Sequence, residues 1–395
     1  MLNRAAGFWI LLCAVAVAQE TNPKLRWSAK VSGIQQGSAA VSDGQIFAPV
    51  IQESAVVSLD AASGKVLWRQ TLADTSPFSP ILDKDSVYVI TGSCTLYRLA
   101  RADGKVLWSR WLAASIESMP TLSGGKIFAA SSDTSFRWAR AGGWHLVCLD
   151  AATGKELWAR KIGTDVAGAP LVMNGQAFVC SKNGVLRAFD VEKGKALWVQ
   201  DAHAQSMPVP CRDWLVYKSA TGLKAVTRMD GKAAWSWDRA NGDSRPREAH
   251  DFRLPMIAGD RAFVTLSETD LACVNLMDRS TVWTWSGGEE APGEPVMVGG
   301  RVYFGTSKGT VLGLNAVTGR KLWEIKTEAA IADAPAIMDG SIYFHDRQGG
   351  LVCVDAGTPE ATGWGMWGGS PTHAGPILSA NPPNVVTPSA ADGVR

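Results

Sequence analysis

The chain has 395 residues, with 39 Lys and Arg against 37 Asp and Glu, and a formal net charge of +2. A charge this small, without any run of five or more basic residues, argues against nucleic-acid binding. Length alone would suggest two or three domains. An internal repeat instead indicates that residues 24–375 form one closed unit.

The first eighteen residues are typical of a secretory signal peptide. Arg4 supplies the positive charge, residues 8–17 form an apolar segment, and an A-x-A cleavage site ends at Ala18. The apolar segment is too short to span a membrane, and no later stretch approaches 18 uninterrupted apolar residues. Cys13 is not preceded by the small residue that a lipid-attachment site needs, so it is interpreted as part of the signal. We expect a periplasmic or secreted protein, cleaved after Ala18.

Eight tryptophans recur at near-constant spacing, and most of them end a ten-residue phrase such as LDAASGKVLW or LDAATGKELW. They are Trp27, Trp68, Trp108, Trp158, Trp198, Trp235, Trp283 and Trp323. Seven prolines keep step with them, and each opens a short apolar run: Pro80, Pro120, Pro170, Pro208, Pro255, Pro295 and Pro335. A period of about 40 residues built of short strands is typical of a β-propeller blade.

One repeat, residues 295–323, shows how a blade is made. Its short apolar runs are bounded by Gly, Asn, Asp or Pro, which predicts four antiparallel strands at 295–298, 301–305, 310–314 and 321–325. The Gly of each T-G-K turn is expected to have a positive φ. Arg279 stands at that place in the sixth repeat, so its turn is expected to differ. The tryptophan that follows is expected to lay its ring over the neighbouring blade.

Eight sets of the first three strands can be counted, but only seven are followed by their own T-G-K-x-x-W strand. The last set ends at residues 352–355, and the missing fourth strand is available at residues 25–29. We therefore predict an all-β, eight-bladed β-propeller over residues 19–375. Its blades are four-stranded and antiparallel, and the N-terminal strand closes the ring. Trp364 is the alternative source of that strand, although it comes one residue late and after a proline.

Six cysteines follow the signal peptide: Cys94, Cys148, Cys180, Cys211, Cys273 and Cys353. Three of them (Cys148, Cys273, Cys353) fall in a slot that other repeats fill with a small residue, namely Ser58, Ala188, Ala225 and Gly313. Because these three lie in different blades, disulfides among them are not expected. Cys180 with Cys211 is the one pair left open. No C-x-x-C or adjacent cysteines occur, which argues against zinc, haem c and redox motifs.

The same small slot holds Arg98 in the second repeat. Two alternatives explain a large cation at this position. Either the side chain reaches a central funnel and meets an anion or a carboxylate, or the strand register slips locally. The sequence does not choose between them, so Arg98 is a candidate funnel residue.

Two insertions interrupt the pattern: residues 133–145 within the third blade and residues 238–252 after the fifth. In a four-stranded meander, both connections leave from the face opposite the tight turns. Long loops on a rigid scaffold often bind partners, and Arg with Trp is common in interfaces. The candidate binding residues are Arg137, Trp138, Arg140, Trp144, His145, Arg239, Arg245, Arg247 and His250. The alternative is a pair of solvated loops without a partner.

The C-terminal segment has two parts. Residues 363–375, GWGMWGGSPTHAG, are expected to be ordered, with their tryptophans packed on the propeller. Residues 376–395 are rich in Pro, Ser and Ala, and we expect them to be disordered.

The phrases LDAASGKVLW, LDAATGKELW and LNAVTGRKLW resemble the tryptophan-docking repeat of pyrroloquinoline-quinone (PQQ)-type propellers. That family includes quinoprotein dehydrogenases and the BamB-like propeller subunits of the outer-membrane β-barrel assembly machine. The tail WGMWGGSPTHAG is similar to a W-P-M-F-x-G-N-P-x-x-T-G segment that accompanies many such repeats. The resemblance covers residues 27–375 and implies the propeller fold.

The resemblance implies two classes of function. The first is an exported, non-catalytic scaffold that binds protein partners in the cell envelope, expected here as a monomer. The second is a quinoprotein dehydrogenase, which needs calcium, an aspartate base and commonly a vicinal disulfide. The chain has no Cys-Cys pair and no Ser-His-Asp or paired-carboxylate set in one region. We therefore predict the scaffold, without cofactor or metal; a propeller that binds a small ligand or carbohydrate is a further alternative.

Overall fold

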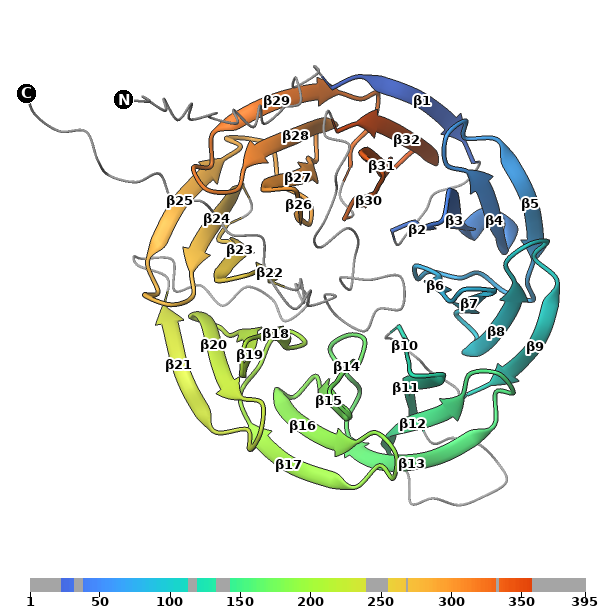
Figure 1. Cartoon of the computed structure of the whole chain (residues 1–395), viewed down its shortest axis with the longest axis vertical. Helices are drawn as coiled ribbons and strands as arrows, with labels where there is room; N and C mark the ends of the chain where they lie inside the picture. Colours follow the sequence, from blue (N-terminus) through green and yellow to red (C-terminus); the bar gives the residue numbers. More distant parts are fainter. Residues whose placement is uncertain are drawn as a thin grey trace, which may run out of the picture.

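The computed structural model describes residues 23–31, 38–112, 119–132, 143–238, 255–267, 269–331 and 334–356. Within these ranges the strands β1 to β32 form eight four-stranded sheets arranged in a ring (Figure 1). This is the predicted eight-bladed β-propeller. The one helix in the described ranges is a short 3-10 turn, Ile51–Glu53, and no described helix is long and apolar enough to cross a membrane.

The first four blades each take four consecutive strands from the inner to the outer edge. Blade one has β2 (Ala40–Ser42), β3 (Gln45–Val50), β4 (Ala55–Asp60) and β5 (Val66–Thr71). Blade two has β6 (Ile81–Leu82), β7 (Ser86–Ile90), β8 (Thr95–Ala100) and β9 (Val106–Trp111). Blade three has β10 (Thr121–Ser123), β11 (Lys126–Ser132), β12 (Trp144–Asp150) and β13 (Glu156–Gly163). Blade four has β14 (Leu171–Met173), β15 (Gln176–Cys180), β16 (Val185–Asp190) and β17 (Ala196–Asp201).

Blades five to seven follow the same plan, and blade eight combines both ends of the described chain. Blade five has β18 (Val209–Cys211), β19 (Trp214–Lys218), β20 (Gly222–Thr227) and β21 (Ala233–Asp238). Blade six has β22 (Met256–Ala258), β23 (Arg261–Thr265), β24 (Asp270–Asn275) and β25 (Thr281–Ser286). Blade seven has β26 (Val296–Val298), β27 (Arg301–Gly305), β28 (Thr310–Asn315) and β29 (Lys321–Lys326). Blade eight has β30 (Ala336–Met338), β31 (Ser341–His345), β32 (Gly350–Asp355) and β1 (Leu25–Lys30).

The N-terminal strand closes the ring, as predicted. β1 pairs antiparallel with β32 and places Trp27 opposite Cys353, so this strand, and not a segment around Trp364, completes blade eight (Figure 1). The Arg26 guanidinium adds a second link between the two ends, because it donates to the Ser341 hydroxyl at 2.7 Å and to the Asp355 carboxylate at 3.0 Å. Because β1 pairs with β32, the outer edge of β32 is not left unpaired.

The tryptophans join neighbouring blades as expected. The Trp68 indole N–H donates to the Arg101 carbonyl of the next blade at 2.9 Å, and Trp158 donates in the same way to Val191. A Cβ on Gly104 would lie 2.6 Å from Trp68 Cε3, so the ring rests directly on the turn. Gly104 also has a φ of +76°. Glycine is therefore required twice in this turn, for its backbone conformation and for the close approach of the ring.

The expectation that the turn of blade six would differ is wrong. Arg279 has a φ of 64°, and its N–H donates to the Asn275 carbonyl at 2.8 Å, as Gly64 does to Asp60 in blade one. The hairpin fixes the left-handed conformation even for a residue that adopts it at a cost. What differs is the tryptophan of the preceding blade. The Trp235 indole N–H finds no acceptor among the described residues, and its ring packs edge-on against Trp214 at 5.7 Å.

The small slot lies directly opposite each docking tryptophan. Cys148, for example, pairs with Trp158 across the β12–β13 ladder, so a side chain in this slot lies beside the indole ring. All six described cysteines are buried and free, including the pair Cys180 and Cys211 that the sequence left open. Burial raises the pKa of the Cys148 and Cys180 thiols to about 12. They therefore remain protonated and act as small apolar side chains.

Neither alternative for Arg98 describes its position. The bulge after Arg98 matches the bulge after Ser58 in blade one, so the register has not slipped. The guanidinium donates to the Ser86 hydroxyl and to the Ala152 carbonyl, both at 2.9 Å. Because Ala152 belongs to the β12–β13 turn of blade three, the side chain links two blades near the outer strands and does not enter a central funnel.

A second arginine of blade two has a larger structural role that the sequence did not signal. Arg101 is 7% exposed and donates to the Gln45 side chain at 3.0 Å and to the Asp43 carboxylate at 2.9 Å. Its guanidinium also lies over the Phe47 ring, 5.3 Å from the centroid. Arg101 occupies the repeat position that is alanine in blades one and three. Its side chain connects blades one and two.

Candidate functional site

The two faces of the ring are built differently. In each antiparallel blade, the turn between strands one and two and the turn between strands three and four lie at one end, which we term the tight-turn face. The loops between strands two and three and the connections between blades lie at the other end, which we term the loop-bearing face. Both sequence insertions belong to connections of the loop-bearing face.

Two of the predicted binding residues lie in a strand and not in the predicted loop. Trp144 and His145 begin strand β12, with His145 paired to Lys161 of β13. His145 is buried, and the Trp144 ring packs against an apolar cluster that includes Ile162. The ladder with β13 extends further than the apolar pattern suggested, because β13 runs to Gly163. The other candidates lie outside the described residues: Arg137, Trp138, Arg140, Arg239, Arg245, Arg247 and His250.

A groove opens on the loop-bearing face where blades five, six and seven meet. The space over it, open solvent included, is about 580 Å³. Its lining comes from the ends of β19 and β23, the start of β20, the end of β21 and the connection before β26. The lining residues are Lys218, Ser219, Gly222, Leu223, Trp237, Pro255, Phe263, Val264, Thr265, Leu266, Glu294 and Pro295. No single sequence motif joins these residues, because they come from three separate repeats.

The floor of this groove is apolar. Leu223, Trp237 and Phe263 belong to one continuous core cluster, and Phe263 is only 1% exposed. Lys218 and Glu294 bring one charge of each sign to the lining. A concave apolar surface with a few polar groups is the usual form of a binding site. The groove also lies beside the blade-five insertion, since its lining includes Trp237 and Pro255 on either side of that segment.

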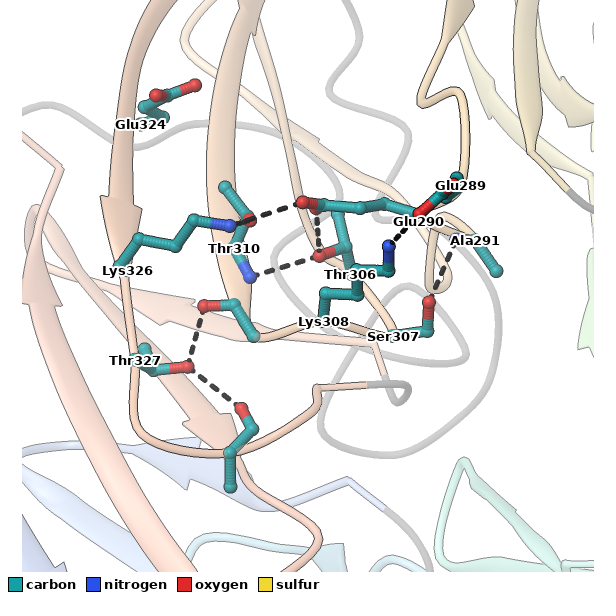
Figure 2. Close-up of polar contacts among 12 residues, drawn as sticks. Glu289, Glu290, Ala291, Thr306, Ser307, Lys308, Thr310, Glu324, Lys326 and Thr327 are labelled. Atoms are coloured by element: carbon teal, nitrogen blue, oxygen red, sulfur yellow. Dashed lines mark hydrogen bonds and ion pairs between the residues drawn. The ribbon is translucent and has the colours of Figure 1, made fainter.

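One wall of the groove is a connection fixed by polar contacts (Figure 2). Glu290 accepts from the Thr306 hydroxyl at 2.7 Å and lies 3.2 Å from Lys326 Nζ, which also contacts the Thr310 hydroxyl. The backbone adds a bridge between Pro292 and Thr306. These contacts tie the segment that leads to Glu294 and Pro295 onto blade seven, so this wall is held in place without a partner.

The same network sets the charge state of Glu290. Its partial burial works against ionisation, but hydrogen bonds from Thr306, Thr310 and Lys326 outweigh that effect and lower the pKa of the carboxyl. Next to it, Glu289 pairs with Lys308 Nζ at 2.6 Å, which lowers the pKa of Glu289 as well. Both carboxylates are therefore charged at neutral pH, and each has a lysine beside it.

A second ion pair holds a blade connection on this face, in blade four. The Asp165 carboxylate lies 2.7 Å from Lys182 Nζ, and the backbone pairs Val166 with Ser181. Burial raises the pKa of Asp165, since its side chain is only 9% exposed. The contact resembles that of Glu290 in its role, because an acid in the connection binds the loop between the second and third strands. Two connections on this face are thus each held by an acid of their own.

Sequence comparison places this architecture in a known family. A family model described as "Outer membrane protein assembly factor BamB" matches residues 14–115, 52–140, 138–213 and 219–361. The chain belongs to this PQQ-repeat family. The matches overlap because the model fits the repeats more than once. No curated protein sequence matches the chain.

Solved structures with the same fold are distant in sequence. The computationally designed protein Ika8 is 12% identical with a TM-score of 0.69, covering 83% of this chain and 98% of its own. A quinohemoprotein alcohol dehydrogenase, ADHIIG from Pseudomonas putida, is 15% identical with a TM-score of 0.64, covering 86% and 77%. BamB from Moraxella catarrhalis is 17% identical with a TM-score of 0.46, covering 85% and 92%. Identities this low show the fold alone, and the fold hosts both enzymes and non-enzymes.

Quinone chemistry can be tested against the residues present. It would require a calcium ion held by several carboxylate and amide oxygens beside the cofactor. Across the described ranges, no group of three His, Cys, Asp or Glu side chains is arranged to hold a metal ion. We derive no reaction step through calcium or a quinone.

Proposed function

We propose that this protein is an exported, non-catalytic scaffold that binds a protein partner of the cell envelope through its loop-bearing face. The observation that carries the proposal is the groove lined by blades five, six and seven. It has an apolar floor, a wall fastened by Glu290, and a place beside the blade-five insertion. Family membership supports a scaffold, because the matched description is that of an assembly factor.

The two insertions would supply the polar part of the interface. Arg137 and Arg140 belong to one insertion, and Arg245 and Arg247 to the other. Arginine can form paired hydrogen bonds to carboxylates, which suits an acidic segment of the partner. The groove would take an apolar side chain from the same partner, as interface pockets commonly do. Export by the N-terminal signal would place the protein with such partners.

Charge reversal of the four arginines tests the proposal. The variant carrying R137E, R140E, R245E and R247E is expected to lose co-purification of its envelope partner and to keep its melting temperature. A matched control reverses four exposed lysines of the tight-turn face, Lys65, Lys105, Lys155 and Lys195, to Glu. The control changes the net charge equally and should retain the partner. Loss in both variants, or in neither, would contradict the assignment of this face.

The groove is tested separately by Thr265→Arg. Thr265 lines the groove and is partly exposed, so a long cation there fills the space without disturbing the core. We expect weaker partner binding at an unchanged melting temperature. If the arginine variant loses binding while T265R binds normally, the insertions bind the partner without the groove.

A further inference from the structure

We term the interface between two neighbouring blades a seam, and we call it well docked when the tryptophan N–H donates to the next blade. The seam between blades seven and eight differs from the six well-docked seams. In six seams the tryptophan indole N–H donates to a backbone carbonyl of the next blade, from Trp27, Trp68, Trp108, Trp158, Trp198 and Trp283. The Trp323 indole nitrogen is buried and has no hydrogen-bond partner among the described residues. The corresponding carbonyl, that of Ala356, accepts from Arg301 Nη1 at 3.3 Å.

The Trp323 ring rests on its own blade. A Cβ placed on Gly313, directly opposite in the β28–β29 ladder, would lie 2.5 Å from Trp323 Cε2 and 2.7 Å from Nε1. The ring thus occupies the space that a side chain fills in the other seven blades, where the slot holds Ser, Arg, Cys or Ala. Blade seven alone has glycine in this slot. The Trp323 ring therefore packs within its own blade, and the centroid of the Tyr303 ring lies 5.8 Å from its centroid.

Among the described residues, no turn glycine lies against the Trp323 ring. In the six well-docked seams, the indole ring rests on the glycine of the next blade's turn between strands three and four. Blade eight takes its fourth strand from the N-terminus, so β32 and that strand are not joined by such a hairpin. The residue aligned with the turn glycine is Pro359, and proline cannot adopt the positive φ of that turn. The described residues therefore supply no turn that covers Trp323 in the way seen at the six well-docked seams.

The chain leaves blade eight at this seam and carries apolar anchors soon afterwards. Ala356 is the last described residue, and Trp364 follows it by eight positions, a reach of up to about 29 Å in extended chain. Trp367 follows three residues later, and glycines flank both rings in the sequence GWGMWGG. The distance confines the first ring to blades near the exit point. Gly-rich flanks allow the close approach that an indole-on-indole contact requires.

We propose that the segment 363–369 docks on Trp323, with Trp364 or Trp367 covering the seam between blades seven and eight. The ring would then be closed twice, by β1 through backbone pairing and by the C-terminal segment through an aromatic contact. The contact lies toward the tight-turn face and the outer strands. It leaves the loop-bearing face open, so this inference is independent of the proposed partner-binding function.

Fluorine NMR on the full chain labelled with 5-fluorotryptophan tests the contact. W323F assigns the Trp323 signal, and W68F assigns Trp68, whose seam is covered by Gly104. The Trp323 signal is expected to shift in the double variant W364A/W367A, whereas the Trp68 signal stays in place. An unshifted Trp323 signal would overturn the proposal. A Trp323 signal that instead moves on dilution would also overturn it, because a second copy of the chain would then cover the seam.

Thermal unfolding gives an independent measurement. If the rings touch, the lowering of the melting temperature by W323A and by W364A/W367A should be less than additive when combined. The same cycle with W68A in place of W323A should be additive, because Trp68 has its own glycine and carbonyl partners. Additivity in both cycles would contradict docking on Trp323. Truncation after residue 375 is a further control and should leave both signals and the melting temperature unchanged.

Discussion

The tight-turn face and the loop-bearing face are made from the same strands but follow different rules. On the tight-turn face the same contact recurs: an indole ring on a turn glycine and an indole N–H on a carbonyl, as in Trp68 with Gly104 and Arg101. On the loop-bearing face, two of the blade connections are each held by a different acid, Glu290 in one and Asp165 in the other. The repeated contacts join neighbouring blades on the tight-turn face, whereas the contacts of the loop-bearing face differ from one connection to another.

The largest effect is expected from removing the closing strand. Deletion of residues 19–30 removes β1, its ladder with β32 and the Trp27 ring on Gly64. Truncation of a large aromatic residue alone costs about 3–5 kcal/mol, and the exposed edge of β32 adds to this loss. We expect a much lower melting temperature and faster proteolysis. A deletion variant as stable as the parent would show that blade eight closes by other means.

The next largest effect compares two tryptophans of the ring. Trp68→Ala removes a ring that is 8% exposed together with its 2.9 Å hydrogen bond, and should cost about 3–5 kcal/mol. Trp235→Ala should cost about 1 kcal/mol less, because its indole N–H has no acceptor to lose among the described residues. Denaturant unfolding of both variants measures the difference. Equal losses would mean that packing alone determines the strength of a seam.

A smaller effect is expected on the loop-bearing face. Glu290→Ala removes the contacts with Thr306 and Lys326 and should lower the free energy of unfolding by only about 1 kcal/mol, since Lys326 is largely exposed. The wall of the groove would become looser, so binding of the partner should fall more than stability does. Glu324→Ala on the same blade is the control, as this acid contacts Lys321 and not the connection. A large loss of stability in E290A would show that the connection supports the ring.

The smallest expected effect is a pH dependence of the tight turns. A hydrogen bond from Ser63 lowers the pKa of Asp60, and one from Thr153 lowers the pKa of Asp150. A folded-state pKa below the unfolded value gives stability that is present above the unfolded pKa and is lost as pH falls through the folded one. The double variant D60N/D150N should therefore lose less melting temperature than the parent between pH 5 and about pH 3. An identical acid profile would contradict this contribution.

Much of the fold could be predicted because the same short sequence pattern recurs in each repeat. The offset between the turn glycine and the tryptophan identifies the outer strand, and the missing eighth copy identifies β1 as the closing strand. Arg279 shows the limit of this logic. Its identity suggested a different turn, but the hairpin hydrogen bond to Asn275 imposes the same left-handed backbone. Local propensity is weaker here than the geometry of the surrounding ladder.

The candidate site could be predicted only in part. The choice of face followed from the meander, because alternate connections must lie at the same end of a blade. The groove did not, since Lys218, Phe263 and Glu294 come from three repeats and meet only when the ring closes. Trp144 and His145 were assigned to a loop because the extra length of the β12–β13 ladder is a property of two paired strands and not of either sequence alone.

The sequence by itself determined the number of blades, the docking tryptophans, the small slot opposite them and the strand that closes the ring. These follow from short-range patterns that recur with a fixed period, so each copy supports the assignment of the others. Tertiary structure alone decided the contacts between unlike residues of different blades. The Arg98 side chain contacts Ala152, and the Arg101 side chain contacts Asp43. Such contacts depend on distances across blade interfaces, and a local sequence pattern contains no information about those distances.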